Sequence, residues 1–390
     1  MTKTNIDQLS SFVSIASTSD GSIRPLQFWG SQRVGLSHTN GNQYSKQERT
    51  INFTRSDHNK STKSNMISIV YGRIFHWVAL FFVGIVLAPC AAQTPQPVQV
   101  FILAGQSNME GQAVVDLAGK DYNFGRGTLV KLMEDPAKAP MFAHLKGSEG
   151  KWTVRDDVFV RYQREDRPLL AGPLAFGFSV YGDVHHFGPE LQFGHIVGDY
   201  FDSPVLLIKT AWGGKSLYRD YRPPSSGGEV GKYYKLMIEQ VREAVANMES
   251  DFPATKSLGY ELAGFVWYQG WNDGVDPKKA VPEYEQNLVN LIHDVRNDLK
   301  KPKLPVVIGE LTGPWVKAEG GWDALRRAQS AAANRPEFAN NVCFVPTHDF
   351  VRKAEESPNT GHGHHEFGNA ETYFLVGDAL GKGMLDLISK

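Results

Sequence analysis

The feature that most limits the fold of this chain is an alternation, from Val98 onward, of strand-like apolar runs with helix-like segments. The helix-like segments lie at residues 233–248, 283–299 and 370–388, where apolar residues return at spacings of three and four. Such alternation predicts a three-layer α/β/α fold around a five-stranded, mostly parallel sheet. The five strand-like runs are VQVFILAG, SPVLLIKTA, LAGFVWYQG, LPVVIGEL and NVCFVPT.

The rest of the chain divides into three further parts. Residues 1–65 are crowded with Ser, Thr, Asn and Gln and predict no fold. Residues 66–92 join a basic residue, an apolar stretch and small residues, which is the layout of a secretory signal peptide, and Met66 suggests a translation start there. We expect cleavage near Ala92 and export; a membrane anchor is the alternative, but the apolar stretch is short for a span. Residues 112–187, rich in Gly and Asp, predict an insertion at the edge of the sheet within a domain at 98–390.

Charge and cysteine content narrow the possible partners and cofactors. The chain has 41 basic and 42 acidic residues, a formal charge of −1, and no basic stripe, which argues against nucleic acid as a partner. Its two cysteines, Cys90 and Cys343, form no CxxC pair, so neither a disulfide framework nor a cysteine zinc site is predicted.

Compact polar residues follow three of the predicted strands. The first strand leads into Gly105, Gln106, Ser107 and Asn108. The second leads into AWGGKSL and the third into WYQGWND, while the histidine-rich segment GHGHHEFGNAETY follows the fifth. Ligands of open α/β sheets bind outside the carboxyl ends of the strands. A serine, a histidine, a carboxylate and amide donors at one edge are the parts needed for nucleophilic acyl transfer.

Each of these residues also has a structural interpretation. Ser107 could cap a following helix, and Gly213 with Gly214 could form a simple turn. The histidines at 362, 364 and 365 could form a surface cluster or a metal site, although no matching ligand set recurs elsewhere. Their arrival at successive strand ends favours the catalytic interpretation.

The same residues carry a family resemblance over roughly Val98 to the C-terminus. GQSNMEG resembles the first block of the SGNH hydrolases, which have a flavodoxin-like sheet, and in particular the branch of sialate O-acetylesterases and carbohydrate esterase family 6. GPELQFG, AWGGKSL, WYQGWND and HEFGNAETYFLVGDALG follow in the order of that branch. The resemblance implies a hydrolase that uses a serine nucleophile and no metal or organic cofactor.

Catalytic roles follow from the chemistry together with the family positions. We expect Ser107 as the nucleophile and His365, which holds the family position, as its base. The main-chain N–H groups of Ser107 and Gly214 and the side-chain amide of Gln269 are the expected oxyanion donors.

The acid of the triad is harder to assign, because His362 and Trp271 stand where relatives carry a carboxylate. Asp273 is the first choice, since it follows the third strand and could orient the histidine. Asp349 in PTHDF is its rival, with Glu190 more distant.

Together these features predict an exported esterase that removes acetyl groups from an acetylated oligosaccharide or polysaccharide, with no stable membrane span after cleavage. The sequence does not choose between acetylxylan, sialic acid and other glycans. A non-catalytic carbohydrate-binding protein on the same scaffold is the alternative, and a metal protein built on the histidine cluster is a further one. The expected substrate-binding side chains are Trp212, Trp267, Tyr268, Trp271 and Glu190.

Overall fold

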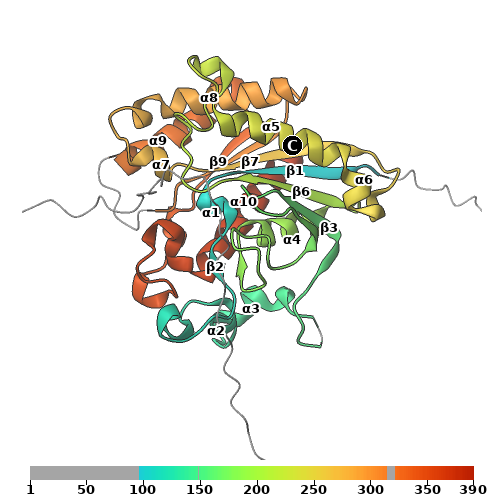
Figure 1. The fold of residues 1–390 in the computed structure, drawn as a ribbon, viewed down its shortest axis with the longest axis vertical. Helices are drawn as coiled ribbons and strands as arrows, with labels where there is room; N and C mark the ends of the chain where they lie inside the picture. The colour runs from blue at the N-terminus through green and yellow to red at the C-terminus, as the bar shows by residue number, and fades with distance from the viewer. Residues whose placement is uncertain (1–95, 148, 314–320) are drawn as a thin grey trace, which may run out of the picture. The chain divides into compact units, whose positions relative to one another are not determined.

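A seven-stranded sheet runs through the centre of this computed structural model, which describes residues 96–390 except 148 and 314–320. Its strand order is β4-β3-β6-β1-β7-β8-β9 (Figure 1). All neighbours are parallel except the edge pair β3 and β4. The strands are β1 (Val98–Gly105), β3 (Arg155–Tyr162), β4 (Leu170–Leu174), β6 (Val205–Ala211), β7 (Tyr260–Tyr268), β8 (Val306–Gly309) and β9 (Val342–Val345).

All five predicted strands are present, and they form the adjacent parallel run from β6 to β9. The predicted insertion does lie at the sheet edge, but it also contributes β3 and β4, so the sheet has seven strands instead of five. The insertion further contributes a small antiparallel pair, β2 (Ala113–Val114) with β5 (His186–Phe187).

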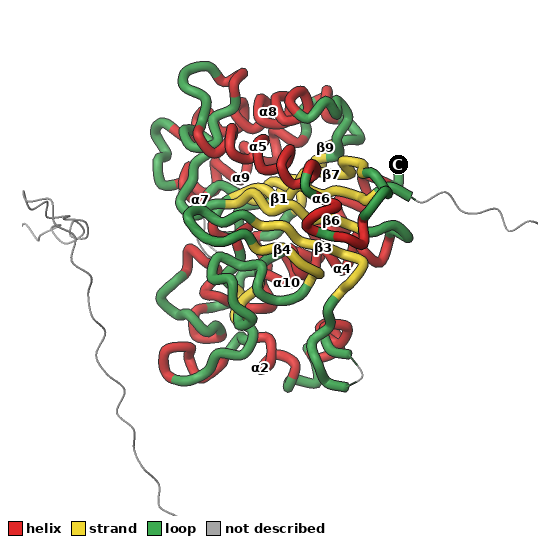
Figure 2. Tube along the Cα trace, turned by 45° about the vertical axis from the view of Figure 1, so that its right-hand side comes forward, coloured by secondary structure: helices red, strands yellow, loops and turns green. Residues whose placement is uncertain are grey.

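Helices cover both faces of the sheet, as Figures 1 and 2 show. One face carries α5 (Lys232–Ala246), α8 (Ala280–Asp298) and α9 (Gly321–Ala333), and the other carries α4 (Glu190–Tyr200) and α10 (Ala370–Ile388). The short helices are α1 (Ser107–Glu110), α2 (Leu129–Met133), α3 (Ala139–Phe142), α6 (Met248–Asp251) and α7 (Trp271–Gly274).

The central strand β1 explains why both faces are covered. Val100 and Ile102 point into the core beneath α5 and α8, whereas Phe101 and Leu103 point into the core beneath α4 and α10. All four side chains are buried, because side chains of a strand alternate between the two faces of a sheet. The three-layer α/β/α prediction is therefore confirmed.

The carboxyl ends of β1, β6 and β7 meet at one edge of the sheet, with α1 and α7 beside them on the left in Figure 1. The signal segment expected at 66–92 and the polar stretch at 1–65 lie outside the described residues. Among the helices that the structure describes, none has both the length and the apolar character needed to cross a membrane.

Candidate active site

The ends of β1 and β7 approach each other so closely that the chain needs glycine there. A Cβ on Gly105 would lie 2.1 Å from the main-chain oxygen of Tyr268. Any larger residue would push the two strand ends apart. The glycine that opens GQSNMEG is thus required by the sheet, and it sets the position of the serine that follows.

Ser107 is the first residue of α1 and lies almost directly after β1. Its side chain is largely buried, and among the described residues its hydroxyl makes no hydrogen bond. A Cβ on Gly213 would lie 3.6 Å from the Ser107 Cβ, so the turn after β6 passes directly beside the serine.

The two polar residues that flank Ser107, Gln106 and Asn108, contact different segments. Gln106 joins α1 to the end of β7: its Oε1 accepts hydrogen bonds from the N–H groups of Gly270 and Asn272 at 3.3 and 3.2 Å. The same oxygen also accepts from the amide of Gln269 at 3.2 Å. Because Gln106 is bonded to the end of β7, the main chain of Ser107 is held in place. The Ser107 hydroxyl itself makes no hydrogen bond to the described residues.

Asn108 joins α1 to the histidine-rich segment. Its Nδ2 donates to Glu366 Oε1 at 2.9 Å, and its Oδ1 accepts from the Tyr373 hydroxyl at 2.9 Å. The Tyr373 hydroxyl also lies 3.3 Å from the main-chain oxygen of His365. The residue after Ser107 is therefore tied to the residue after His365.

His365 lies in a tight turn, η8 (Gly363–Gly368), directly before α10. Glu366 and Phe367 have φ of +51° and +54°, a left-handed backbone that non-glycine residues adopt at a cost. The His365 ring is half-buried, and its centroid lies 4.0 Å from that of His364. Burial, followed by the neighbouring His364 and His362, lowers the pKa of His365 to about 3, so its imidazole is neutral at neutral pH.

No hydrogen bond joins Ser107 to the His365 ring among the described residues. Such bonds are often long in unliganded enzymes and tighten when substrate binds. The histidine cluster itself does not form a metal centre: within the described part of the chain, no three His, Cys, Asp or Glu side chains are arranged to hold an ion.

Asp273, the expected triad acid, is fully buried in α7 with a different set of partners. Its two oxygens accept from the main-chain N–H groups of Leu217 and Tyr218, each at 2.8 Å, and from Gln269 Nε2 at 2.7 Å. Burial raises the pKa of Asp273 to about 6, although these hydrogen bonds act to lower it. Among the described contacts, Asp273 anchors the loop after β6 and does not touch His365.

The other two carboxylates considered for that role are also engaged elsewhere. Asp349 is exposed, and its Oδ1 lies 3.1 Å from Nε2 of His348, not of His365. Glu190 is completely buried at the start of α4 and pairs with Lys209 at 2.8 Å. That burial also removes Glu190 from the substrate-binding surface where the sequence suggested it would lie.

The two expected oxyanion donors outside α1, Gly214 and Gln269, differ in the hydrogen bonds that they already make. Gly214 has φ of +71°, which favours glycine, and its main-chain oxygen accepts from Asn272 Nδ2 at 2.8 Å. The Gln269 amide, by contrast, already lies within hydrogen-bond distance of three acceptors, on Gln106, Lys215 and Asp273. In this arrangement Gln269 links the loops, which differs from the free donor that the sequence suggested.

Most of the aromatic residues expected at the mouth of the site are in the core. Trp212, Trp267 and Tyr268 are at most 3% exposed, because they lie in or directly after strands that are covered on both faces. This corrects the expectation that they stack on sugars. Trp271 is half-buried, and its ring lies 5.9 Å from that of His364, so it remains beside the histidine segment.

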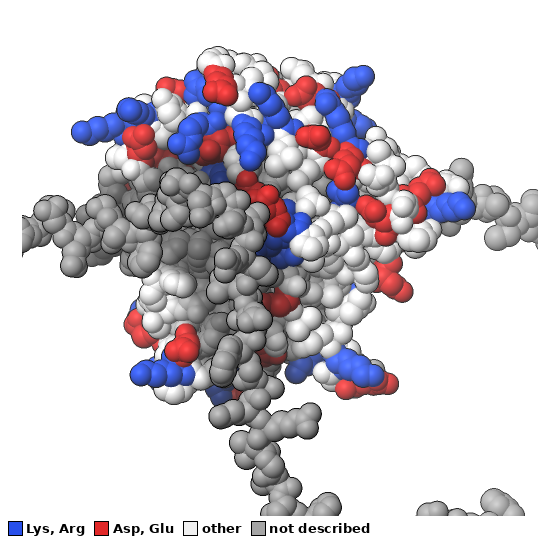
Figure 3. Space-filling view, in the orientation of Figure 1, with Lys and Arg blue, Asp and Glu red and all other residues white. Residues whose placement is uncertain are grey.

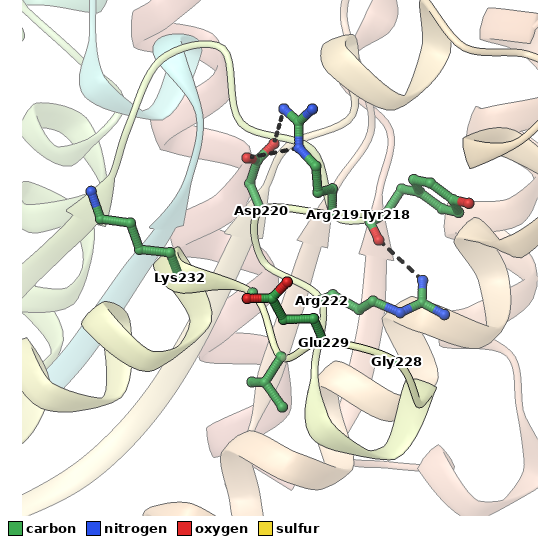
Figure 4. A pocket seen from close by; sticks show the side chains of 9 residues that line it. Tyr218, Arg219, Asp220, Arg222, Gly228, Glu229 and Lys232 are labelled. Atoms are coloured by element: carbon green, nitrogen blue, oxygen red, sulfur yellow. Dashed lines mark hydrogen bonds and ion pairs between the residues drawn. The ribbon is translucent and has the colours of Figure 1, made fainter.

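An open pocket of about 470 Å³ lies along the loop that follows Gly213 and Gly214 (Figure 4). Nine residues between Tyr218 and Lys232 line it. Several of its charged side chains have partners: Arg219 contacts Asp220 at 3.3 Å, and Arg222 contacts Glu283, outside the pocket, at 3.0 Å. On the face drawn in Figure 3, acidic and basic side chains are likewise interspersed over the described residues.

Sequence reasoning missed the residues that hold the site together, above all Glu110, Lys209 and Glu366. A signal for Lys209 was present, since a lysine inside the apolar run VLLIKTA needs a buried partner, which Glu190 supplies. No comparable signal marks the contact between Asn108 and Glu366, because it joins segments 258 positions apart.

Comparisons with known proteins identify the family of this chain. A family described as "Carbohydrate esterase, sialic acid-specific acetylesterase" matches residues 97–373. A probable carbohydrate esterase of Arabidopsis thaliana is 28% identical over 251 residues, which are 63% of this chain and 78% of that protein.

Two solved structures are also similar. One, from Arabidopsis thaliana, has 18% identity and a TM-score of 0.46, with 74% of this chain and 98% of that chain covered. The other, a carbohydrate acetylesterase from Xanthomonas citri, has 15% identity and a TM-score of 0.42, with 73% and 56% covered. The family match confirms the resemblance carried by the sequence blocks: this chain belongs to the family of carbohydrate esterases described as sialic acid-specific acetylesterases.

Proposed function

We propose that this carbohydrate esterase is an exported O-acetylesterase that acts through a serine nucleophile. The observation that carries the proposal is the arrangement around Ser107. Its polar neighbours are all bonded to other segments, one of which bears His365, and its own hydroxyl is free of hydrogen bonds to the described residues.

In the proposed reaction the neutral His365 imidazole takes the Ser107 proton as Oγ attacks the acetyl carbonyl. The carbonyl oxygen becomes an oxyanion, for which the main-chain N–H groups of Ser107 and Gly214 are the proposed donors. The imidazolium then gives its proton to the departing sugar oxygen, which leaves an acetyl-serine. Water attacks that ester, and acetate is released.

The orienting acid for His365 has two candidates, Asp273 and Asp349. The buried position of Asp273 near the loop of the site favours it over the exposed Asp349. Its three existing donors argue for a role in the loop instead. The two roles predict different behaviour of the Asp273→Asn variant.

An acetylated oligosaccharide or polysaccharide is the proposed substrate. The pocket beyond Gly214 supports this proposal, because it lies along the loop that follows the proposed oxyanion donor and is lined by polar side chains and Tyr218. Sugar rings use both kinds of contact in protein sites. The half-buried Trp271 supplies a second ring near the histidine segment.

The central test is acetate release from a panel of acetylated sugars, with and without a chelator. We expect release that the chelator does not change, and we expect Ser107→Ala to abolish it while the protein still folds and binds glycan. If the Ser107→Ala variant kept more than about a few per cent of turnover, the nucleophile would lie elsewhere. Glycan binding without any release would favour the non-catalytic alternative, and loss with chelator would favour the metal protein.

Export is tested separately by N-terminal sequencing of the secreted protein. The layout of residues 66–92 supports a secreted form that begins near Gln93. Recovery of residues 1–65 on a folded and active protein would overturn both the start at Met66 and the cleavage site.

A further inference from the structure

A completely buried ion pair contacts the short helix that begins with Ser107. Lys209 of β6 and Glu190 of α4 expose none of their side-chain surface, and Lys209 Nζ lies 2.8 Å from Glu190 Oε2. The same ammonium donates to the main-chain oxygens of Glu110 and Phe178 at 2.9 and 2.5 Å. Only a protonated lysine has three N–H groups, so the three oxygens together accept every proton of a charged ammonium.

The contact with the Glu110 oxygen matters because α1 cannot stabilise itself. The helix has only four residues, Ser107–Glu110, and a helix of this length is not stable on its own in water. The last carbonyls of any helix also lack partners within it. The Glu110 oxygen is one of these carbonyls, and an ammonium is a strong, charge-assisted donor for it. Lys209 therefore holds the end of the helix whose first residue is Ser107.

Glu190 holds the same helix end from a second side. Its Oε1 accepts from the Gly188 N–H at 2.9 Å, while its Oε2 faces Lys209. Gly188 in turn packs against Gly111, the residue after α1: a Cβ on Gly111 would lie 2.3 Å from the Gly188 Cα. One carboxylate thus fixes both the lysine and the main chain on which the end of α1 rests.

The remaining contacts of Lys209 come from the insertion at the edge of the sheet. Phe178, whose main-chain oxygen accepts from Lys209, lies between β4 and β5. Tyr162 ends β3; its ring centroid lies 4.8 Å from Lys209 Nζ, and its hydroxyl donates to Glu110 Oε1 at 2.9 Å. The buried ammonium therefore joins β6, the insertion and α1.

We propose that Lys209, paired with Glu190, is a positioning residue of this esterase: its ammonium fixes the end of α1 and so the place of Ser107 beyond β1. The inference rests on the proposed serine mechanism. Neither side chain touches the reacting atoms in this proposal; both act through the main chain of α1. Because an attacking oxygen must be closely aligned with its target, a small displacement of α1 should slow the chemical step more than it weakens binding.

The test compares Lys209→Met with the double variant Lys209→Met/Glu190→Gln. The single change leaves a buried carboxylate unpaired, which destabilises the fold, whereas the double change removes both charges and keeps an acceptor for Gly188. We expect the double variant to have a urea midpoint nearer to the wild type than that of Lys209→Met. Its kcat for acetate release should still be about 10-fold to 100-fold low, with KM changed less than about twofold. A role in stability alone predicts that kcat recovers together with the midpoint.

Arg296→Met is the matched control. Arg296 of α8 is also a buried cation that donates to main-chain oxygens, those of Leu304 at 2.8 Å and Asn341 at 3.2 Å. These two residues precede β8 and β9, at the edge of the sheet opposite to Ser107. We expect Arg296→Met to lower the urea midpoint and to keep kcat within about twofold of the wild type. An equal loss of kcat in Arg296→Met, or wild-type kcat in the double variant, would overturn the proposal.

Hydrogen exchange covers the case in which the double variant does not fold. In the wild type the amides of Glu110 and Gly111 bond to the oxygens of Gln106 and Ser107 at 2.9 and 3.1 Å. If Lys209 holds α1, these two amides should exchange within about tenfold of the rates in β1, although the helix has four residues. Faster exchange in the wild type would overturn the proposal. Because exchange is measured without substrate, it separates failure of this inference from absence of esterase activity.

Discussion

Asn108 Nδ2 donates a hydrogen bond of 2.9 Å to Glu366 Oε1, across 258 positions of the chain. Both side chains are at most 5% exposed. Asn108 follows Ser107 and Glu366 follows His365, so this one bond joins the segment of the proposed nucleophile to the segment of the proposed base. Burial raises the pKa of Glu366 to about 7, against hydrogen bonds that include the one from Asn108.

Removal of this bond should separate the two segments. We expect Glu366→Ala to lower kcat by about tenfold or more and to cost about 1–3 kcal/mol of unfolding free energy, because the Asn108 amide is left unpaired in the core. Glu366→Gln keeps an acceptor and should be mild. Acetate-release kinetics and urea unfolding measure the two effects. Glu371→Ala, which loses ion pairs to Lys138 and Arg352 in α10, is the control for general damage; an equal loss of kcat there would contradict the assignment.

The protonation of Glu366 should also appear in the dependence of stability on pH. Its pKa rises from the ordinary 4.5 to about 7 on folding, so the folded state holds the proton more tightly. The resulting stabilisation is complete below pH about 4.5 and disappears as pH rises through about 7. The difference in unfolding free energy between the wild type and Glu366→Gln should therefore change across this window and be flat above it. A constant difference from pH 4 to 8 would show that Glu366 is not shifted.

The three histidines should differ sharply in their importance. We expect His365→Ala to be nearly as severe as Ser107→Ala, because His365 is the proposed base and its main chain is held by Tyr373. His362→Ala and His364→Ala should be mild, since in the proposal these rings only flank it. Turnover of the three purified variants on one acetylated substrate measures this. Severe loss at His364 with a mild effect at His365 would move the base to His364.

The low pKa of His365 gives a further expectation about stability. Folding lowers this pKa from 6.5 to about 3, so the unfolded chain binds the proton more readily between these values. The contribution of His365 to stability is present above pH about 6.5 and is lost as pH falls toward 3. Unfolding experiments should show a shallower acid-side decline for His365→Gln than for the wild type. An identical decline would mean that the ring is protonated normally in the folded protein.

The sequence predicted the central strands well because each is a continuous apolar run that is buried on both faces. β3 was missed because it opens with Arg155, Asp156 and Asp157, whose exposed or half-exposed side chains interrupt the apolar pattern. The edge strand β4 contains Pro173, which weakens a strand prediction. The pattern is thus clear in the parallel run from β6 to β9 and weak in β3 and β4, at one side of the sheet.

The prediction of the site had a similar limit. Features set by neighbouring residues were predicted, whereas features set by distant segments were not. Gly105 and Ser107 stand in one short block, so the strand end was visible in the sequence. The sequence placed Trp212 and Trp267 at a surface because they stand near strand ends, but both pack into the core beneath α5 and α8. Whether a side chain at a strand end faces a helix or the solvent depends on distant segments, which local patterns do not encode.

The role of Asp273 decides the third member of the site. Its oxygens accept from Leu217, Tyr218 and Gln269, so we expect Asp273→Asn to disturb the loop after β6 by placing an NH₂ group against one of those donors. A loop effect should lower kcat by about tenfold and leave the His365 ring resonances unchanged. Loss of an orienting acid would lower kcat by up to about 10⁴-fold and alter the tautomer of the base.

The matched variant is Asp349→Asn, at the exposed carboxylate beside His348. We expect it to have little effect, because Asp349 contacts a different histidine and is largely in solvent.

NMR of the His365 ring together with turnover then separates three outcomes. A large loss with a changed ring at Asp273→Asn would make Asp273 the triad acid after all. The same result at Asp349→Asn, with Asp273→Asn near normal, would make the triad Ser107, His365 and Asp349. A tenfold loss at Asp273→Asn with an unchanged ring would support its role as the anchor of the loop that carries Gly213 and Gly214 to the serine.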